Sequence, residues 1–378
     1  MIYFDCAASS LKKPPSVYDA YLDAMRRFSC GVGRSGYGAA VRAGELIYAA
    51  REDIADFFGM QSASGVIFTQ NATHAINIAL KGALSAGDRL VISDMEHNAV
   101  YRSALWLGSR GVSVDFSHAA HSDDETCESF AAAFERGARA VCVTHVSNVF
   151  GNVLPIRRIF REARRRGIIT ILDASQSAGS IRINMTDDFI DILCCPGHKG
   201  LMGPQGTGLL LINGDVTLSP LIHGGTGGAS RDEDMPEYLP DRFEAGTGHT
   251  AGAIALGEGV RFIKSIGCEA IFDHEKSLAA LMKRGLSKIG GVTVYEYGEN
   301  TAGLFSFNID ALDCEQTAAR LWEHGICVRS GLHCAPLAHK TVGTLERGTV
   351  RVSAGAFNKK SEADALLRAV RDIARGSA

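Results

Sequence analysis

Seven short apolar segments between residues 66 and 212 constrain the fold more than any other feature of the chain. They span residues 66–69, 89–93, 112–116, 139–145, 168–172, 190–195 and 207–212. Up to about residue 168, segments with helical periodicity separate them. Strands that alternate with helices in this way form a mainly parallel sheet with helices on both faces. We therefore predict an α/β fold whose large domain contains a mainly parallel seven-stranded sheet.

The pattern changes after the seventh strand candidate, which indicates a second domain. Residues 223–248 form a long loop with two Gly-Gly pairs. Residues 267–378 then combine helices and strands without the regular alternation, which is typical of a separate, smaller α+β domain. We assign 15–255 to the large domain, and 1–14 together with 256–378 to the small domain.

Composition excludes several classes of function. Charged residues make up 21% of the 378 residues and the formal net charge is −3, which provides no basic surface for nucleic acid or for anionic membranes. No apolar run approaches the roughly 20 residues of a membrane span, and the N-terminus lacks a signal-peptide layout. Ten irregularly spaced cysteines indicate reduced thiols, without metal-ligand spacing. We expect a cytoplasmic enzyme with no metal, nucleic-acid or membrane partner.

Polar side chains follow five of the strand candidates, at the point where each strand ends. The clusters are Gln70-Asn71-Ala72-Thr73-His74, Glu96-His97-Asn98, His145-Val146-Ser147-Asn148, Asp173-Ala174-Ser175-Gln176 and His198-Lys199. The carboxyl ends of parallel strands meet at one edge of a sheet, and α/β proteins bind their ligands there. The sequence therefore predicts a polar site at this edge.

Asp173 and Lys199 are the most informative pair. Asp173 ends a very apolar strand, where a buried carboxylate needs a partner, and Lys199 enters a glycine-rich turn after the next strand candidate. Pyridoxal phosphate (PLP) needs a carboxylate at its ring nitrogen and a lysine at its aldehyde carbon. Taken singly, Asp173 is equally typical of a backbone-bonded turn, and a lysine at a strand end is more often a solvated residue.

Two further clusters suit the same cofactor. Asn71-Ala72-Thr73 opens a helix directly after a strand, where free N–H groups and the Thr73 hydroxyl favour a phosphate. A simple N-cap at Thr73 explains this pattern equally well. His97 is suited to stacking on an aromatic ring or to proton transfer, although a histidine at this position is more often a turn residue.

Four motifs together resemble a known family. They are Asp173-Ala-Ser-Gln176, Gly197-His-Lys199, Arg242-Phe-Glu-Ala-Gly-Thr247 and Arg329-Ser-Gly-Leu-His-Cys334. In order and spacing they resemble the cysteine desulfurase and selenocysteine lyase family. That family belongs to the class V aminotransferases, which are fold-type I (aspartate-aminotransferase-like) PLP enzymes. The resemblance extends from Tyr3-Phe-Asp5 to the last helix, and the short cysteine loop is similar to the group II branch.

The resemblance implies roles for residues around the cofactor ring. Lys199 would carry PLP, and Asp173 would pair with the pyridinium nitrogen. Gln176 would contact the phenolic oxygen O3′, and His97 would stack on the ring. Asn148 would border both O3′ and the substrate carboxylate.

The resemblance also implies how phosphate and substrate are held. Thr73 and His198 would bind the phosphate, with Ala72 beside them at the helix start. Arg351 would bind the substrate carboxylate, a task suited to its planar, bidentate fork. Thr247 would reach the phosphate of a neighbouring subunit, which implies a homodimer with shared active sites.

Three positions depart from the group II pattern. The family has histidine where this chain has Tyr37, a hydroxyl residue in place of Pro196 and threonine in place of Ala72. Because the last two lack hydroxyls expected at the phosphate, we predict weaker PLP binding than is typical of the family. Arg34 and Tyr37, from the glycine-rich loop 30–38, are expected to contact the substrate, and Tyr37 leaves the substrate and the sulfur acceptor open.

The function predicted from the resemblance is conversion of L-cysteine to L-alanine, with a persulfide on Cys334 and transfer of the sulfur to an acceptor protein. A loop cysteine alone is ordinary, but nearby cations and exposure favour its thiolate. His97 would serve proton transfers at the substrate thiol. Three alternatives stay open: a selenocysteine lyase acting on L-selenocysteine, a fold-type I epimerase or transaminase, and a sulfur-carrier scaffold on an inactive enzyme fold. The joint presence of Lys199, Asp173 and Arg351 argues against the scaffold.

Overall fold

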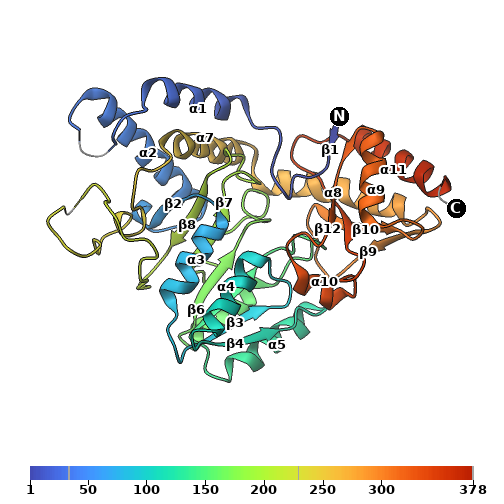
Figure 1. The fold of residues 1–378 in the computed structure, drawn as a ribbon, viewed down its shortest axis with the longest axis horizontal. Helices are drawn as coiled ribbons and strands as arrows, with labels where there is room; N and C mark the ends of the chain where they lie inside the picture. The colour runs from blue at the N-terminus through green and yellow to red at the C-terminus, as the bar shows by residue number, and fades with distance from the viewer. Residues whose placement is uncertain (33–34, 229, 377–378) are drawn as a thin grey trace.

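A seven-stranded sheet forms the centre of the protein in a computed structural model that describes residues 1–32, 35–228 and 230–376. The strand order is β2-β8-β7-β6-β5-β3-β4 (Figure 1). In chain order the strands are β2 (Val66–Thr69), β3 (Arg89–Ser93), β4 (Ser113–Ser117), β5 (Ala140–Thr144), β6 (Ile169–Asp173), β7 (Ile192–Pro196) and β8 (Gly208–Ile212). All seven predicted strands are present, each within two residues of its predicted bounds.

The predicted, mainly parallel character of the sheet is confirmed, with one reversed strand. β8 runs antiparallel to both of its neighbours, β2 and β7, whereas the other pairings are parallel. The reason is that the chain returns from β7 to β8 through the short, glycine-rich turn 197–207. A parallel connection needs a longer crossover, usually a helix.

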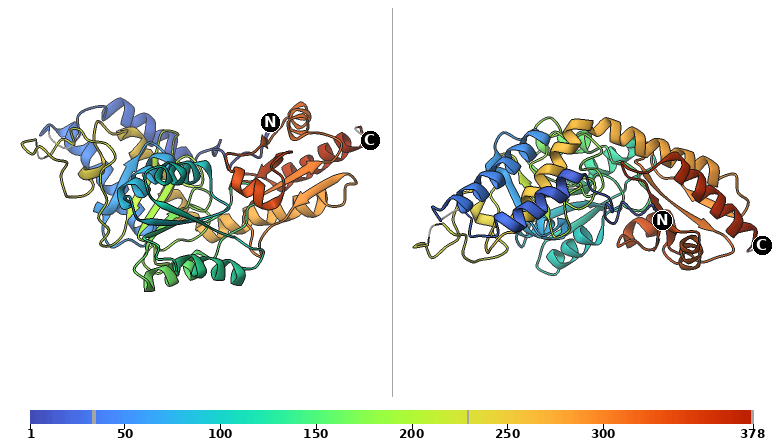
Figure 2. Two further views of the ribbon diagram at one scale, coloured as in Figure 1. Left: turned by 60° about the horizontal axis from the view of Figure 1, so that its bottom comes forward. Right: turned by 90° about the horizontal axis from the view of Figure 1, so that it is seen from above.

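Helices cover both faces of this sheet (Figures 1 and 2). One face packs against α3 (Ala72–Ala83) and α4 (Asn98–Gly108). The other packs against α2 (Gly38–Phe57), α5 (Asp123–Phe134), α6 (Ile156–Arg165) and α7 (Thr250–Ile266), and α1 (Pro15–Arg27) lies against α7. Because both faces are covered, β5, β6, β7 and β8 are buried at every position, which explains their continuous apolar sequences.

The C-terminal part forms a second, smaller α+β unit, drawn in orange and red in Figure 1. Its antiparallel sheet has the order β12-β13-β10-β9. The strands are β9 (Val292–Tyr295), β10 (Leu304–Ile309), β12 (Arg329–Gly331) and β13 (Thr349–Ser353). Its helices are α8 (Cys268–Leu286), α9 (Cys314–Glu323), α10 (Pro336–Val342) and α11 (Lys360–Arg375).

The N-terminal segment connects the two units. β1 (Ile2–Tyr3) pairs in parallel with β11 (Ile326–Cys327) of the C-terminal unit. The chain then crosses to the large sheet, where the Ser10 N–H donates to the carbonyl of His198 (3.0 Å). Residues 5–10 therefore lie between the units, beside the carboxyl ends of the strands (Figure 1).

The expected domain boundary at 255/256 falls inside α7, which continues unbroken from Thr250 to Ile266 and packs against α1 and α2. We propose Gly267, between α7 and α8, as the boundary. Its φ of +93° provides the break between the two helices. None of the helices in the described ranges is long and apolar enough to cross a membrane.

Candidate active site

The carboxyl ends of the strands open into a cavity of about 230 Å³ between the two units. Nine residues with a predicted site role line it together: Ala72, Thr73, His97, Asn148, Asp173, Gln176, His198, Lys199 and Arg351. They come from the ends of five strands, the starts of two helices and the C-terminal sheet. The structure thus brings together residues that are up to 279 positions apart, from Ala72 to Arg351.

The N-terminus of α3 forms one end of the cavity. Asn71, not Thr73, is the N-cap, because its side-chain oxygen accepts a hydrogen bond from the His74 N–H (2.9 Å). The Thr73 hydroxyl is left without a hydrogen-bond partner in the described part of the chain. Gly208 of β8 makes this arrangement possible, since a Cβ there would lie 2.6 Å from the Asn71 backbone.

Asp173 lies at the end of β6 and is 1% exposed. Its Oδ1 accepts hydrogen bonds from the backbone N–H (2.9 Å) and the hydroxyl of Ser175. No lysine, arginine or histidine within the described ranges forms an ion pair with it. The backbone-bonded turn considered in the sequence analysis therefore accounts for one oxygen of Asp173. The other, Oδ2, has no hydrogen-bond partner among the described residues.

Lys199 follows β7 in the turn that precedes β8. Its Nζ makes neither a hydrogen bond nor an ion pair with any described residue. Burial, followed by the nearby Arg351 charge, lowers the pKa of this amine to about 8. The turn is anchored by the N-terminal segment, because the neighbouring His198 carbonyl accepts from Ser10 and from Lys13 Nζ (2.9 Å).

Two histidines at the cavity are neutral near pH 7. His97 is the N-cap of α4, and its Nδ1 accepts from the Ala99 N–H (3.1 Å), which places the ring proton on Nε2. Burial lowers the pKa of His97 to about 4. Burial likewise lowers the pKa of His198 to about 4, and its Nδ1 lies 3.2 Å from the Ser9 hydroxyl. Both rings are therefore uncharged, and the ionisable side chains that act on them are Asp173, Lys199, Lys13, Arg329 and Arg351.

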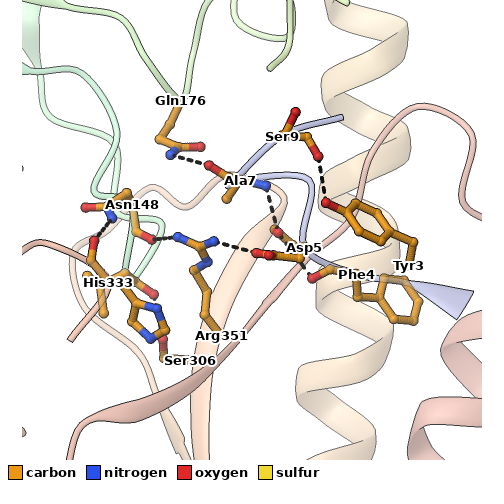
Figure 3. A network of polar contacts seen from close by, with 12 residues as sticks. Tyr3, Phe4, Asp5, Ala7, Ser9, Asn148, Gln176, Ser306, His333 and Arg351 are labelled. Carbon is orange, nitrogen blue, oxygen red and sulfur yellow. Dashed lines mark hydrogen bonds and ion pairs between the residues drawn. The ribbon is translucent and has the colours of Figure 1, made fainter. Parts of the chain in front are cut away.

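Arg351 reaches the cavity from β13 and is 1% exposed. Its Nη1 donates to the carbonyl of Asn148 (3.0 Å), and its Nη2 lies 2.7 Å from Asp5 Oδ1 in an ion pair (Figure 3). Burial lowers the pKa of the guanidinium, whereas Asp5 raises it. The arginine predicted to bind a carboxylate is thus already paired with one.

Cys334 is exposed and directly follows His333, which lines the cavity. Its loop is fixed from both sides: the Asn98 N–H donates to the Cys334 carbonyl (2.7 Å), and the Asn148 side chain donates to the His333 carbonyl (2.7 Å). His333 and Cys334 both adopt left-handed backbone conformations, with φ of +51° and +59°. Non-glycine residues seldom adopt this conformation, and it is typical of functional loops.

Two further predicted site residues do not line this cavity. Tyr37 and Thr247 are exposed on the surface of the chain and do not line it. Arg34 lies outside the described residues. The role of Thr247 in a neighbouring subunit is untested by a single chain and stays a prediction.

Sequence reasoning gave no role to several residues at the site. Arg329 and His333 line the cavity, and both stand in the loop motif that ends at Cys334. Asp5 contacts Arg351 across 346 residues of sequence. The sequence indicated a role for Asp5 only through its place in Tyr3-Phe-Asp5, where the family resemblance begins.

The unpaired groups of the cavity fit PLP. Asp173 offers a buried carboxylate oxygen for a protonated ring nitrogen, and Lys199 offers an unpaired amine for the aldehyde. The start of α3 offers free N–H groups and the Thr73 hydroxyl for a phosphate. No group of acidic, histidine or cysteine side chains within the described ranges is arranged to hold a metal ion.

Comparisons with known proteins show which proteins this chain resembles. The model of the aminotransferase class-V family matches residues 2–366. A probable cysteine desulfurase of Methanothermobacter thermautotrophicus is 35% identical over 380 residues, which cover 99% of this chain and 94% of that protein. Another, from Pyrococcus abyssi, is 32% identical, with coverage of 99% and 94%.

Solved structures show the same fold. The apo structure of the cysteine desulfurase from Thermococcus onnurineus has a TM-score of 0.92 at 31% identity and covers 99% of this chain and 95% of that one. The cysteine desulfurase CsdA from Escherichia coli has a TM-score of 0.89 at 26% identity, with coverage of 99% and 94%. The family resemblance and the fold type predicted from the motifs are thereby confirmed over nearly the whole chain.

Proposed function

Because the chain belongs to the class-V aminotransferase family, we propose that it is a PLP-dependent cysteine desulfurase, which converts L-cysteine to L-alanine and retains the sulfur as a persulfide on Cys334. One observation supports this proposal most strongly. A buried carboxylate, an unpaired lysine and a free helix N-terminus converge on one cavity, and the Cys334 loop lies at its rim.

Each of the cavity residues named here has a separate role in the proposed reaction. Bound PLP acts as an electron sink that acidifies the substrate Cα–H bond. Asp173 would hold the ring nitrogen of the cofactor in its protonated form. Lys199 accepts the Cα proton, and a pKa of about 8 makes its amine a suitable base near neutral pH. Arg351 binds the substrate carboxylate and so orients Cα towards Lys199.

Cys334 receives the sulfur. Its thiolate attacks the substrate sulfur, the new S–S bond forms, and the Cβ–S bond breaks with its electron pair moving to the carbon side. Proton return to Cβ then yields alanine, so one cysteine and one enzyme thiol give one alanine and one enzyme persulfide. His97, neutral with its proton on Nε2, would exchange protons with the substrate thiol. An acceptor protein would then take the sulfur from the exposed loop.

The direct test supplies L-cysteine to the PLP-loaded protein and measures L-alanine and protein-bound sulfane sulfur. Equal amounts of both are expected in the first turnover. L-Selenocysteine is assayed in parallel. Alanine from selenocysteine alone would identify a selenocysteine lyase, and alanine from neither substrate would overturn both activities in favour of another class-V reaction or of a scaffold role.

A further inference from the structure

The environment of Arg351 contains one acidic partner that the proposed mechanism does not use. Asp5, in the segment after β1, contacts Nη2 of the guanidinium and does not line the cavity. Of the carboxylates in the described ranges, only that of Asp5 forms an ion pair with Arg351. Its backbone bridges Ser353, two positions along β13 from Arg351, which fixes the segment beside the strand.

The two contacts of Arg351 leave a defined edge open. Each Nη atom carries two hydrogens, and one of each is engaged, by Asn148 on Nη1 and by Asp5 on Nη2. Figure 3 shows these partners on opposite sides of the guanidinium, with Ala7 and Gln176 beyond its outer end. Both of those residues line the cavity. The two remaining Nη hydrogens therefore form a two-pronged fork at the end that faces the cavity, the geometry that binds a carboxylate bidentately. The Nε–H is also buried without a partner among the described residues.

The charges around Arg351 also favour binding of a carboxylate from the cavity. Arg351 is almost fully buried and shares the cavity with Lys199 and Arg329, both of which are cationic when protonated. An unpaired buried charge is costly, and removing one partner of a buried pair leaves the other uncompensated. Asp5 offsets this cost from outside the cavity, so no acidic group has to enter the space that the substrate carboxylate needs.

We infer that Asp5 is a positioning residue for substrate recognition: together with the Asn148 carbonyl it clamps the Arg351 guanidinium so that its free fork receives the carboxylate of the amino-acid substrate. This inference rests on the proposed function, because it assumes that Arg351 binds the substrate. Asp5 itself touches neither the substrate nor the cofactor.

The test uses the PLP-loaded variants Asp5→Ala and Asp5→Asn. The asparagine variant keeps the shape and one acceptor oxygen but loses the charge. Cys6→Ala is the matched control, since Cys6 follows Asp5 in the same segment and its side chain contacts Asn358, not Arg351. For each protein, kcat and KM for L-cysteine are measured. Binding of L-alanine and of ethylamine, which differ only in the carboxylate, is followed by the change in the visible absorbance of the cofactor.

We expect KM for L-cysteine to rise roughly tenfold or more in Asp5→Ala, with a smaller rise in Asp5→Asn and a lesser change in kcat. The Kd of L-alanine should rise in parallel, whereas the Kd of ethylamine and all values of Cys6→Ala should stay unchanged. The ethylamine result is the readout that a merely structural role would not give.

Unchanged L-alanine binding in both Asp5 variants would overturn the inference, as would an equal loss of ethylamine binding. Should Asp5→Ala not fold, Asp5→Asn carries the same comparison. A wild-type protein that binds L-alanine but releases no alanine from L-cysteine would contradict the proposed function alone. The contrast between L-alanine and ethylamine would still decide the role of Asp5.

Discussion

Lys199 combines the two properties that covalent attachment of PLP requires, an unpaired amine and a pKa lowered to about 8 by burial. We expect Lys199→Ala to lose the visible absorbance of the lysine-bound cofactor and all alanine formation, because attachment point and base disappear together. Borohydride reduction followed by peptide mapping identifies the modified lysine. Lys276→Ala, an exposed lysine on α8, is the control and should behave like the wild type. An adduct on any other lysine would show that the assignment is wrong.

Glu96 is a second buried ionisable group, located behind the cavity. Its Oε1 accepts from Ser93 and from the Thr144 N–H, Oε2 has no partner in the described part of the chain, and burial raises its pKa to about 8 from an ordinary value of 4.5. The folded protein therefore keeps this proton up to about pH 8, whereas the unfolded chain releases it near pH 4.5. The resulting contribution to stability is lost as the pH rises through this window.

Glu96→Gln should remove that pH dependence, because glutamine resembles the protonated acid. One pKa unit corresponds to about 1.4 kcal/mol, so we expect the variant to be more stable than the wild type at pH 9 by a few kcal/mol. At pH 5 the advantage should be absent. Urea unfolding of both proteins at the two pH values measures the difference. An equal difference at both pH values would mean that Glu96 is ionised in the folded protein.

At the scale of elements, the N-terminus of α3, which we propose as the phosphate site, depends on the close approach of α3 to β8. Alanine at Gly208 would place its Cβ 2.6 Å from the Asn71 backbone, which cannot move aside as a flexible side chain can. We expect Gly208→Ala to displace the start of α3 and to weaken PLP binding roughly tenfold or more, with a destabilisation of about 1–3 kcal/mol. Equilibrium dialysis of PLP measures the first effect.

Gly290→Ala is the matched control, since a Cβ there meets nothing within 4 Å and the φ is not positive. Equal PLP affinity in Gly208→Ala and Gly290→Ala would contradict a phosphate site at the start of α3. The weaker phosphate binding expected from Ala72 and Pro196 stays a prediction. Both residues line the cavity, and neither carries a hydroxyl.

The strands were predictable because parallel strands buried on both faces have continuous apolar sequences, as in Ile169–Asp173. The edge at which the polar clusters meet follows from the same pattern. The reversal of β8 leaves no trace in the strand Gly208–Ile212 itself, which is equally apolar in either direction. Its signal is the short, glycine-rich connection 197–207, which is too short for a parallel crossover. The Asp5–Arg351 pair joins residues 346 positions apart, and no local periodicity encodes such a contact.

At the scale of the whole molecule, α1 lies on the outside of the large unit against α7 (Figure 1) and carries exposed apolar side chains. Tyr18, Leu22 and Met25 of α1 are each about half exposed. Their spacing places them on one face of the helix, and exposed apolar patches commonly mark interfaces. This face suits the homodimer that the family resemblance implies.

We expect the protein to be a homodimer and the double variant Leu22→Glu/Met25→Glu to be monomeric, because two charges would be buried at the interface. Light scattering measures the mass, and Leu345→Glu in the C-terminal unit is the control. If Thr247 completes the active site of the neighbouring subunit, the monomer should also bind PLP more weakly. A fully active monomer would contradict that role.

The measurement that tests the central claim most directly is the mass of the Cys334 peptide after a single turnover with L-cysteine, recorded together with alanine. The account predicts one additional sulfur atom on Cys334 for each alanine formed. It also predicts that Cys334→Ala binds L-cysteine but forms no persulfide and little alanine, because Lys199 and Arg351 are intact while the sulfur has no acceptor. Unchanged alanine formation by Cys334→Ala, or a persulfide on a different cysteine, would contradict it.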